Sequence, residues 1–327
     1  MKHLIYTPTA KLTEAEWQSL RQSFVREGMV GGSDAGTLLG LNPYKSPINM
    51  YYQAIGVSNL PNMMNSAMLH GKQLEHYVAN CWQYYDGTDD GWVANTLADN
   101  KIKKYKKVKS IIQNPKYPML FANIDGVITH HPNYKKQGIL EIKTISGYSS
   151  DSYEGGIPPS YLIQLQHYML VCELSWGEVC YLKDGRQLGC VTFEADKELQ
   201  ERIIFEAQDF QNRVKSARQE IGAITDENEK LNIATAYEPN ADSSKAFNEF
   251  ISEKHKSREE EITIQGSDEQ EQWAWEYVKL SANIKELEGN KQLYQNKIKQ
   301  AMEKEGATTM ILPSGKVTWR KQFNIKL

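Results

Sequence analysis

The sequence predicts an α/β or α+β protein, in which a central mixed β-sheet is flanked by helices and a helical extension follows at the C-terminal end. Helical apolar patterns fill most of the first 85 residues, and alternating β-type patterns follow between residues 107 and 144. A further helix and two more strands come next. Antiparallel strands followed by a helix and further strands typically form a mixed sheet with helices packed on it.

Size and composition set broad limits. The 327 residues suggest about two domains, and 40% hydrophobic with 24% charged residues is ordinary for a globular chain. No apolar run reaches the roughly 18–20 residues that span a bilayer, and the first residues lack the apolar core of a signal peptide. We therefore expect a cytoplasmic protein.

Charge and cysteine content exclude some classes of function. A net charge of −3 excludes a globally basic nucleic-acid binder, although cationic charge can be concentrated in one channel. The four cysteines include no CxxC pair and no zinc spacing. They are expected to be ordinary buried thiols.

Two helices are predicted at the start of the chain. Residues 13–28 carry an apolar stripe, and Thr13 with Glu16 forms a capping box before it. Two glycines then break the pattern, and a short helix is expected to begin with Ser33 as its N-cap and to end at Gly40.

Two more helices complete the N-terminal part. Ser46-Pro47 marks the start of the first, with proline at its first position. Residues 66–85 form a longer amphipathic helix that carries Glu75.

The centre of the chain is predicted to be rich in strands. Turn signals at Asn114-Pro115 and around Pro132 separate the β-type segments. The expected strands cover residues 107–113, 119–130 and 138–144, then two strands within 176–193; the expected helices cover 158–174 and 196–220.

The composition changes near residue 223. Residues 1–223 are expected to form the catalytic domain, and residues 224–266, which are polar, a linker-like segment. Residues 267–327 contain one long helix over 268–305 and a small β-hairpin.

Three charged residues stand inside the apolar strands. Asp125 lies in the segment 119–130, and Glu141 and Lys143 lie in 138–144. In a strand, Glu141 and Lys143 share one face with Ile139. Charged groups inside such strands are costly unless they are paired or bind a metal.

This trio suits phosphodiester hydrolysis. Asp125 and Glu141, with a backbone carbonyl, are hard oxygen ligands for Mg²⁺ or Mn²⁺. Lys143 would orient the attacking water or stabilise developing negative charge. The plain alternative is an edge-strand aspartate and a surface Glu–Lys pair.

Further polar residues are candidates for the same site. Glu75 could supply another acid, although a solvated helix glutamate is the simpler interpretation. Gln164 and Gln166 lie in an otherwise apolar helix, where their amides could contact a phosphate or the water. His167 beside them is expected to be an ordinary core or surface histidine.

The order of these motifs resembles a known family. Asp125, Glu141-Ile142-Lys143 and Gln164-x-Gln166 resemble the PD-(D/E)xK nuclease superfamily. The segments 31–34 and 39–47 and the spacing of Gly71 and Glu75 are similar to the YqaJ-type viral recombinase exonucleases, relatives of lambda exonuclease and the alkaline exonucleases. The resemblance covers roughly residues 20–215, and only the proline before the first acid is missing.

The resemblance implies a restriction-endonuclease-like core and a 5′-to-3′ exonuclease. Such an enzyme degrades one strand of linear double-stranded DNA with two divalent metal ions and leaves a 3′ overhang. Asp125, Glu141 and the Ile142 carbonyl would hold metal, and Glu75 would lie near the second ion. Lys143 would be catalytic, and Gln166 would position the water.

The resemblance also implies contacts with DNA. Arg26 and Ser33 match a pair that holds the 5′ phosphate, and a helix N-terminus suits such a group; a surface arginine and a simple N-cap are the alternatives. Residues 101–109 contain six lysines, including Lys103, Lys104 and Lys106. They are expected to neutralise phosphates, or else to protect an edge strand from aggregation.

The same resemblance implies partners, and two other functions are alternatives to the exonuclease. Relatives form ring-shaped homotrimers and work with a single-strand annealing protein, so both are expectations here. An endonuclease of the same fold, which needs no 5′-phosphate socket, is one alternative. A non-catalytic DNA-binding scaffold is another, although the intact acid–acid–lysine set argues against it.

Overall fold

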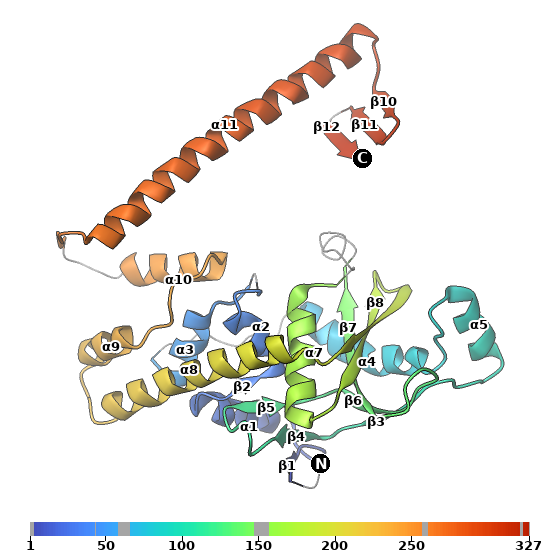
Figure 1. Ribbon diagram of the computed structural model, residues 1–327, viewed down its shortest axis with the longest axis vertical. Helices are drawn as coiled ribbons and strands as arrows, with labels where there is room; N and C mark the ends of the chain where they lie inside the picture. The colour runs from blue at the N-terminus through green and yellow to red at the C-terminus, as the bar shows by residue number, and fades with distance from the viewer. Residues whose placement is uncertain are drawn as a thin grey trace. The chain divides into compact units, whose positions relative to one another are not determined.

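The computed structural model describes residues 3–42, 44–57, 66–146, 157–256 and 261–320, and the backbone of 323–326. They belong to two compact units, Met1–Ser257 and Arg258–Leu327, and each is described by itself. Figure 1 shows the elements of both.

A five-stranded mixed sheet forms the centre of the first unit. Its order is β3-β6-β7-β8-β9, and only the β7–β8 pair is parallel. The parallel pair requires a crossover, which contains helix α7 (Pro159–Cys172). The predicted mixed sheet is thus confirmed. Its strands are β3 (Lys104–Lys107), β6 (Gly126–His130), β7 (Gly138–Ile145), β8 (Trp176–Lys183) and β9 (Gln187–Glu194).

Helices cover the two faces of this sheet, and β7 shows which side chains meet which helix. Ile139 belongs to the core that includes Leu165 of α7, whereas Leu140 and Ile142 pack with Trp82 of α4 (Ser66–Trp82). Both helices contact β7, as Figure 1 illustrates. The side chains of β7 therefore alternate as the sequence predicts: Ile139 faces α7, and Leu140 and Ile142 face α4.

A second sheet explains why Asp125 is not inside a strand. The predicted strand 119–130 is interrupted: β5 pairs in one sheet and β6 in the other, and Asp125 lies where the chain passes between them. The predicted strand 107–113 likewise becomes β3 and β4, one in each sheet. The second sheet has the order β1-β4-β5-β2, with β1 (Ile5–Pro8), β2 (Val30–Gly31), β4 (Ser110–Gln113) and β5 (Leu120–Ala122).

The predicted N-terminal helices are present. Helix α1 (Glu14–Arg26) has the Thr13–Glu16 capping box, and α3 (Pro47–Ile55) begins after Ser46. Helix α2 (Gly32–Leu38) begins two residues earlier than expected, with Gly31 rather than Ser33 in the cap position. A further helix, α5 (Asp89–Leu97), was not expected.

The linker predicted over residues 224–266 is wrong for most of its length. Helices α9 (Glu227–Ala236) and α10 (Lys245–Lys256) follow α8 (Lys197–Ile221) and belong to the first unit. The Tyr51 hydroxyl on α3 donates to the Ala234 carbonyl at 2.8 Å. The few apolar side chains of these polar helices pack inward on α3 and α8.

The second unit contains the predicted long helix, α11 (Asp268–Lys304). The predicted hairpin is part of a three-stranded antiparallel sheet, β10 (Thr309–Leu312), β11 (Gly315–Trp319) and β12 (Phe323–Lys326). Met302 on the helix and Val317 on β11 are fully buried. Within the described ranges, no helix has the length and apolar character that a membrane span requires.

Candidate active site

Two carboxylates, one partly exposed and one buried, meet at the junction between the two sheets. Asp125 lies before β6, and Glu141, 2% exposed, lies on the neighbouring strand β7. The Ile142 N–H donates to Asp125 Oδ2 at 2.8 Å, which fixes the aspartate against β7. Burial, the Glu141 charge and the Glu75 charge raise the pKa of Asp125 well above its usual value. Burial also raises the pKa of Glu141.

A lysine and a glutamine complete this cluster. Lys143 Nζ donates to Glu141 Oε1 at 2.6 Å and to Gln164 Oε1 at 3.0 Å. Gln164 Nε2 donates to Glu141 Oε1 at 2.8 Å and to the Tyr168 hydroxyl at 3.0 Å. Burial alone would lower the pKa of Lys143, but Glu141 and Asp125 outweigh it and raise that pKa. Lys143 is therefore a cation held in place by the two acids.

The donor set fits a divalent cation. Glu141 Oε2 is buried and has no hydrogen-bond partner. When both of these adjacent acids are ionised, they bring more negative charge than Lys143 neutralises, and oxygen ligands are those that Mg²⁺ prefers. Among the described residues, no three His, Cys, Asp or Glu side chains converge closely enough to hold a metal without movement.

Glu75 lies near this pair but faces a lysine. Lys107 Nζ donates to Glu75 Oε1 at 2.6 Å, while the Glu75 charge still contributes to the raised pKa of Asp125 and Glu141. The preformed part of the site is therefore Asp125 and Glu141, and Glu75 is an acid within electrostatic reach.

Gln166 is not brought to the carboxylates. Its Nε2 donates to the Glu194 carbonyl at 2.8 Å and its Oε1 accepts from the Asp196 N–H at 2.9 Å, so it ties α7 to the end of β9. Two residues on a helix differ by about 200° in direction, so Gln164 and Gln166 cannot face the same site. The amide at the site is that of Gln164.

Exchanging each glutamine for alanine should separate these roles. We expect Gln164→Ala to slow metal-dependent DNA cleavage by about tenfold or more, because Lys143 and Glu141 lose a shared partner. Gln166→Ala should lower the melting temperature, since the Glu194 carbonyl and the Asp196 N–H lose their partner, with less effect on cleavage per folded molecule. Rates and melting curves of both variants test this; a reversed order would contradict it.

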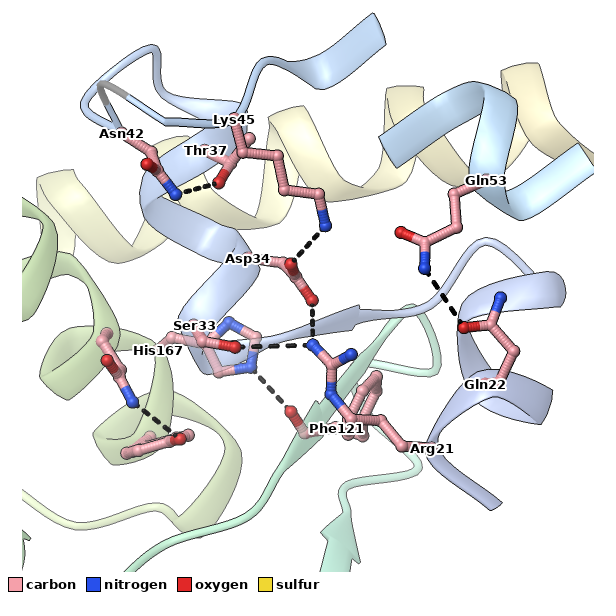
Figure 2. Close-up of polar contacts among 12 residues, drawn as sticks. Arg21, Gln22, Ser33, Asp34, Thr37, Asn42, Lys45, Gln53, Phe121 and His167 are labelled. Atoms are coloured by element: carbon pink, nitrogen blue, oxygen red, sulfur yellow. Dashed lines mark hydrogen bonds and ion pairs between the residues drawn. The ribbon is translucent and has the colours of Figure 1, made fainter. Parts of the chain in front are cut away.

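Asp125 opens onto a cleft that also contains a cationic socket, formed by Arg21, Lys45 and Ser33. The cleft has a volume of about 670 Å³. Asp125 and Glu75 line it, together with Arg21 and Ser33. Figure 2 shows the socket: Arg21 comes from α1 and reaches Ser33 on α2.

The socket is held by a buried aspartate. Asp34 Oδ2 accepts from Arg21 Nη2 at 2.6 Å, and Asp34 Oδ1 accepts from Lys45 Nζ at 3.1 Å (Figure 2). Arg21 Nη2 also lies 3.5 Å from Ser33 Oγ. Burial disfavours the charge of Asp34, yet Lys45 and Arg21 outweigh it and lower its pKa. Two cations around one acid leave a net positive socket.

The arginine beside Ser33 is Arg21, whereas the sequence pointed to Arg26. Arg26, at the end of α1, lines a different hollow together with Arg218. A signal for Arg21 is present in the sequence: it lies four residues after Trp17 and three before Phe24, on the apolar stripe of α1. A charged residue on a buried helix face indicates a partner such as Asp34.

His167 has an inward, structural position. It is fully buried, its Nε2 lies 2.9 Å from the Phe121 carbonyl, and burial lowers its pKa to about 4. The imidazole is therefore neutral at pH 7, and its Nε2–H donates to the carbonyl. This agrees with the expectation of an ordinary core histidine.

The lysine run divides into buried and exposed members. Lys103 is 5% exposed, and its Nζ lies 3.5 Å from Glu178 and over the Trp82 ring. The prediction that Lys103 contacts DNA is therefore wrong, because a buried, paired ammonium cannot reach a phosphate. Lys104 and Lys106 are exposed on β3 and stay candidates.

Reversing the two exposed charges should weaken binding to duplex DNA. For Lys104→Glu/Lys106→Glu we expect a several-fold higher Kd and a shallower salt dependence, since fewer counterions are released. Lys135→Glu/Lys136→Glu, also exposed, is the matched control. Titration of a labelled duplex at several salt concentrations measures both effects. Equal affinity in both double variants would remove β3 from the DNA path.

Comparison with known proteins agrees with the order of motifs. Residues 16–175 match the model of the YqaJ-like viral recombinase domain. The YqaJ protein of Bacillus subtilis (strain 168) is 26% identical over 302 residues, which cover 91% of this chain and 81% of that protein.

Two solved structures are similar. The alkaline exonuclease LHK-Exo from Laribacter hongkongensis is 18% identical, with a TM-score of 0.45, over 65% of this chain and 99% of that one. A phage related exonuclease from Haemophilus somnus 129PT is 15% identical, with a TM-score of 0.36, over 57% and 95%. The family match covers the part of the chain that carries Asp125, Glu141, Lys143 and Gln164, and residues 16–175 are therefore similar to a YqaJ-like viral recombinase domain.

Proposed function

We propose that this chain is a divalent-metal-dependent deoxyribonuclease that degrades one strand of linear double-stranded DNA from the 5′ end. The observation that carries the proposal is the hydrogen-bonded cluster of Asp125, Glu141, Lys143 and Gln164. Through Asp125, this cluster borders the same cleft as Arg21 and Ser33. All of these residues lie within the family match.

The roles of the side chains follow from their positions. Asp125 and Glu141 would hold Mg²⁺ or Mn²⁺, with the Ile142 carbonyl and Glu75 as further candidates, and two ions are expected from the resemblance. The metal, when bound, supplies a Lewis acid and lowers the pKa of water. Lys143 would donate to the negative charge that develops on the phosphate. Gln164 would keep Lys143 and Glu141 in register.

The cationic socket supports action at a DNA end. Arg21, Lys45 and the Ser33 hydroxyl provide donors for a terminal phosphate, and Asp34 holds the two cations in place. An endonuclease, which cuts without an end, has no use for such a socket. The common cleft therefore favours an exonuclease, and the 5′ polarity rests on the family resemblance.

The partners belong to the same proposal. The 3′ overhang left by the enzyme would be bound by a single-strand annealing protein of the phage type. A homotrimer would enclose the DNA and make digestion processive. Sedimentation of the nuclease at working concentration tests the assembly, and a monomer there would contradict it.

One experiment tests reaction, metal and end dependence together. End-labelled linear duplex, with or without a 5′ phosphate, and a covalently closed circle are incubated with and without Mg²⁺. We expect digestion of the linear duplex only with Mg²⁺, faster with the 5′ phosphate, and an intact circle. Cutting of the circle would favour the endonuclease, and no digestion under any condition would favour the scaffold.

A pair of arginine variants sharpens the test. Arg21→Ala should reduce the preference for a 5′ phosphate, because it removes the donor beside Ser33. Arg26→Ala on the same helix is the matched control and should keep the preference. Loss of the preference in Arg26→Ala but not in Arg21→Ala would show that Arg26 binds the 5′ phosphate, as the family resemblance implies.

A further inference from the structure

Helix α11 carries an apolar stripe that its own unit leaves exposed. Trp273, Tyr277 and Leu280 are 60%, 73% and 55% exposed, and Ile284 and Leu287 are 56% and 67% exposed. The buried side chains of this unit, among its described residues, lie at the C-terminal end of α11 and on β11. A helix of 37 residues gains most of its stability from packing of such a face.

The stripe repeats every seven residues. Spacings alternate between four and three from Trp273 through Tyr277, Leu280 and Ile284 to Leu287. The same register continues through Tyr294 and Ile298 to Ala301, with Lys291 as the one charged member. A strict seven-residue repeat is the pattern of helices that wind around each other, whereas a single straight helix follows 3.6 residues per turn.

The charges beside the stripe match a second α11 that runs in the opposite direction. Glu276 and Lys297 directly precede the stripe residues Tyr277 and Ile298 and therefore flank the stripe. If Ile284 faces Leu287 of the second helix, Glu276 lies beside Lys297 of the other copy, and Glu269 likewise lies beside Lys304. The twofold symmetry makes each of these pairs twice. Opposite charges at such flanking positions set the orientation of coiled coils.

The parallel arrangement lacks these pairs. It would place Glu276 beside Ser281, Asn283 beside Glu288 and Lys297 beside Met302. It would also place Lys291 of one chain against Lys291 of the other in the seam, the line along which the two stripes meet, and these two like charges repel. In the antiparallel arrangement Lys291 faces Leu280, and its stem can pack while its ammonium reaches water.

We propose that α11 is a dimerisation element, whose Trp273–Ala301 stripe forms an antiparallel two-stranded coiled coil with α11 of a second copy of this chain. All residues of this interface belong to the second unit. Trp275, Val278 and Leu293 lie on the other faces of the helix and stay outside the seam.

Two leucine variants of the full-length chain test the seam. Leu287→Asp puts a charge into it, and Leu293→Asp puts the same charge on the opposite face, where the leucine is 50% exposed. We expect Leu287→Asp to lower the mass measured by light scattering to that of the assembly that the chain forms without α11 pairing, and Leu293→Asp to keep the wild-type mass. An unchanged mass in Leu287→Asp would overturn the proposal.

Cysteine pairs test the direction. Glu276→Cys/Lys297→Cys should form a disulfide between chains under mild oxidation, because the two sites on one helix are about 30 Å apart and cannot join each other. The two single variants should not cross-link. Lys291→Cys should cross-link to its copy only in a parallel pair, so that product would overturn the antiparallel arrangement.

Charge exchange provides an independent check. Glu276→Lys and Lys297→Glu should each weaken association, and the double exchange should restore it, because the pair is re-formed with its signs reversed. The dimer Kd of the three variants measures this. An additive loss in the double variant would overturn the Glu276–Lys297 pairing.

Discussion

Replacing Lys143 with alanine is expected to lower the rate of metal-dependent cleavage of linear duplex by about 10²–10³-fold, the loss typical of one preorganised donor. Lys143 is fixed by Glu141 at 2.6 Å and by Gln164 at 3.0 Å. These contacts hold the ammonium next to the two acids before substrate arrives. The effect should be on kcat, because the charge is needed when negative charge develops on the phosphate.

Controls separate catalysis from folding. Lys143→Ala leaves Glu141 without its ion partner, so Lys143→Met, which keeps the length and packing of the stem, is made beside it. Lys135→Ala, at an exposed position, is the matched control for charge. Single-turnover cleavage and melting curves are measured for all three. Wild-type rates in folded Lys143→Met would contradict the assigned role.

The strands of the site could be predicted because their pattern is local. Glu141 and Lys143 share a face of β7 simply because side chains alternate along a strand, and Ile139 and Leu140 pack in the two different cores as expected. Asp125 was identified as a charge inside an apolar segment. The break that it occupies was not, because it depends on pairing with two different sheets.

The glutamines illustrate what a pattern cannot determine. Residues Ile163–Cys172 of α7 are all buried, so the helix has no polar face that would show which amide points to the site. Only the tertiary partners decide: Glu141 for Gln164, and Glu194 for Gln166. A helix that is apolar all round predicts burial and not direction.

Charged residues were misjudged where burial depends on distant partners. Lys103 belongs to a surface-like lysine run, yet Glu178, 75 positions away, draws it into the core. Arg21 was overlooked because Asp34 is buried between it and Lys45. The sequence predicts a linker where the polar helices α9 and α10 lie, because the contacts that stabilise these helices come from other elements, α3 and α8.

The second large effect concerns stability, and it is expected from Asp125→Asn. In the folded protein, burial and the charges of Glu141 and Glu75 raise the pKa of Asp125 well above its usual value. In the unfolded chain the pKa of this carboxyl is about 3.9. Between these two values the folded protein holds a proton that the unfolded chain releases. The stability of the wild type therefore falls as the pH rises through that interval.

Asparagine removes this cost. Its oxygen can still accept from the Ile142 N–H, and its amide N–H can donate to Glu141. Without metal, the variant should melt at a higher temperature than the wild type at neutral pH. The expected rise is about 2–4 °C for each kcal/mol by which the free energy of unfolding increases. The difference between variant and wild type should shrink as the pH falls toward 4. Mg²⁺ should raise the melting temperature of the wild type and have little effect on the variant, which should also be inactive.

Asp34→Asn is the matched control, because its sign is opposite. Lys45 and Arg21 lower the pKa of Asp34 against the effect of burial, so this carboxylate contributes stability above its unfolded pKa, and the contribution is lost as the pH falls. Asp34→Asn should thus melt lower than the wild type at neutral pH and keep the response to Mg²⁺. Two aspartates that line one cleft would then differ for one reason: the cations that pair with Asp34 belong to the chain, whereas Asp125 must bind a metal ion from solution. An equal Mg²⁺ shift in wild type and Asp125→Asn would show that the metal is held elsewhere.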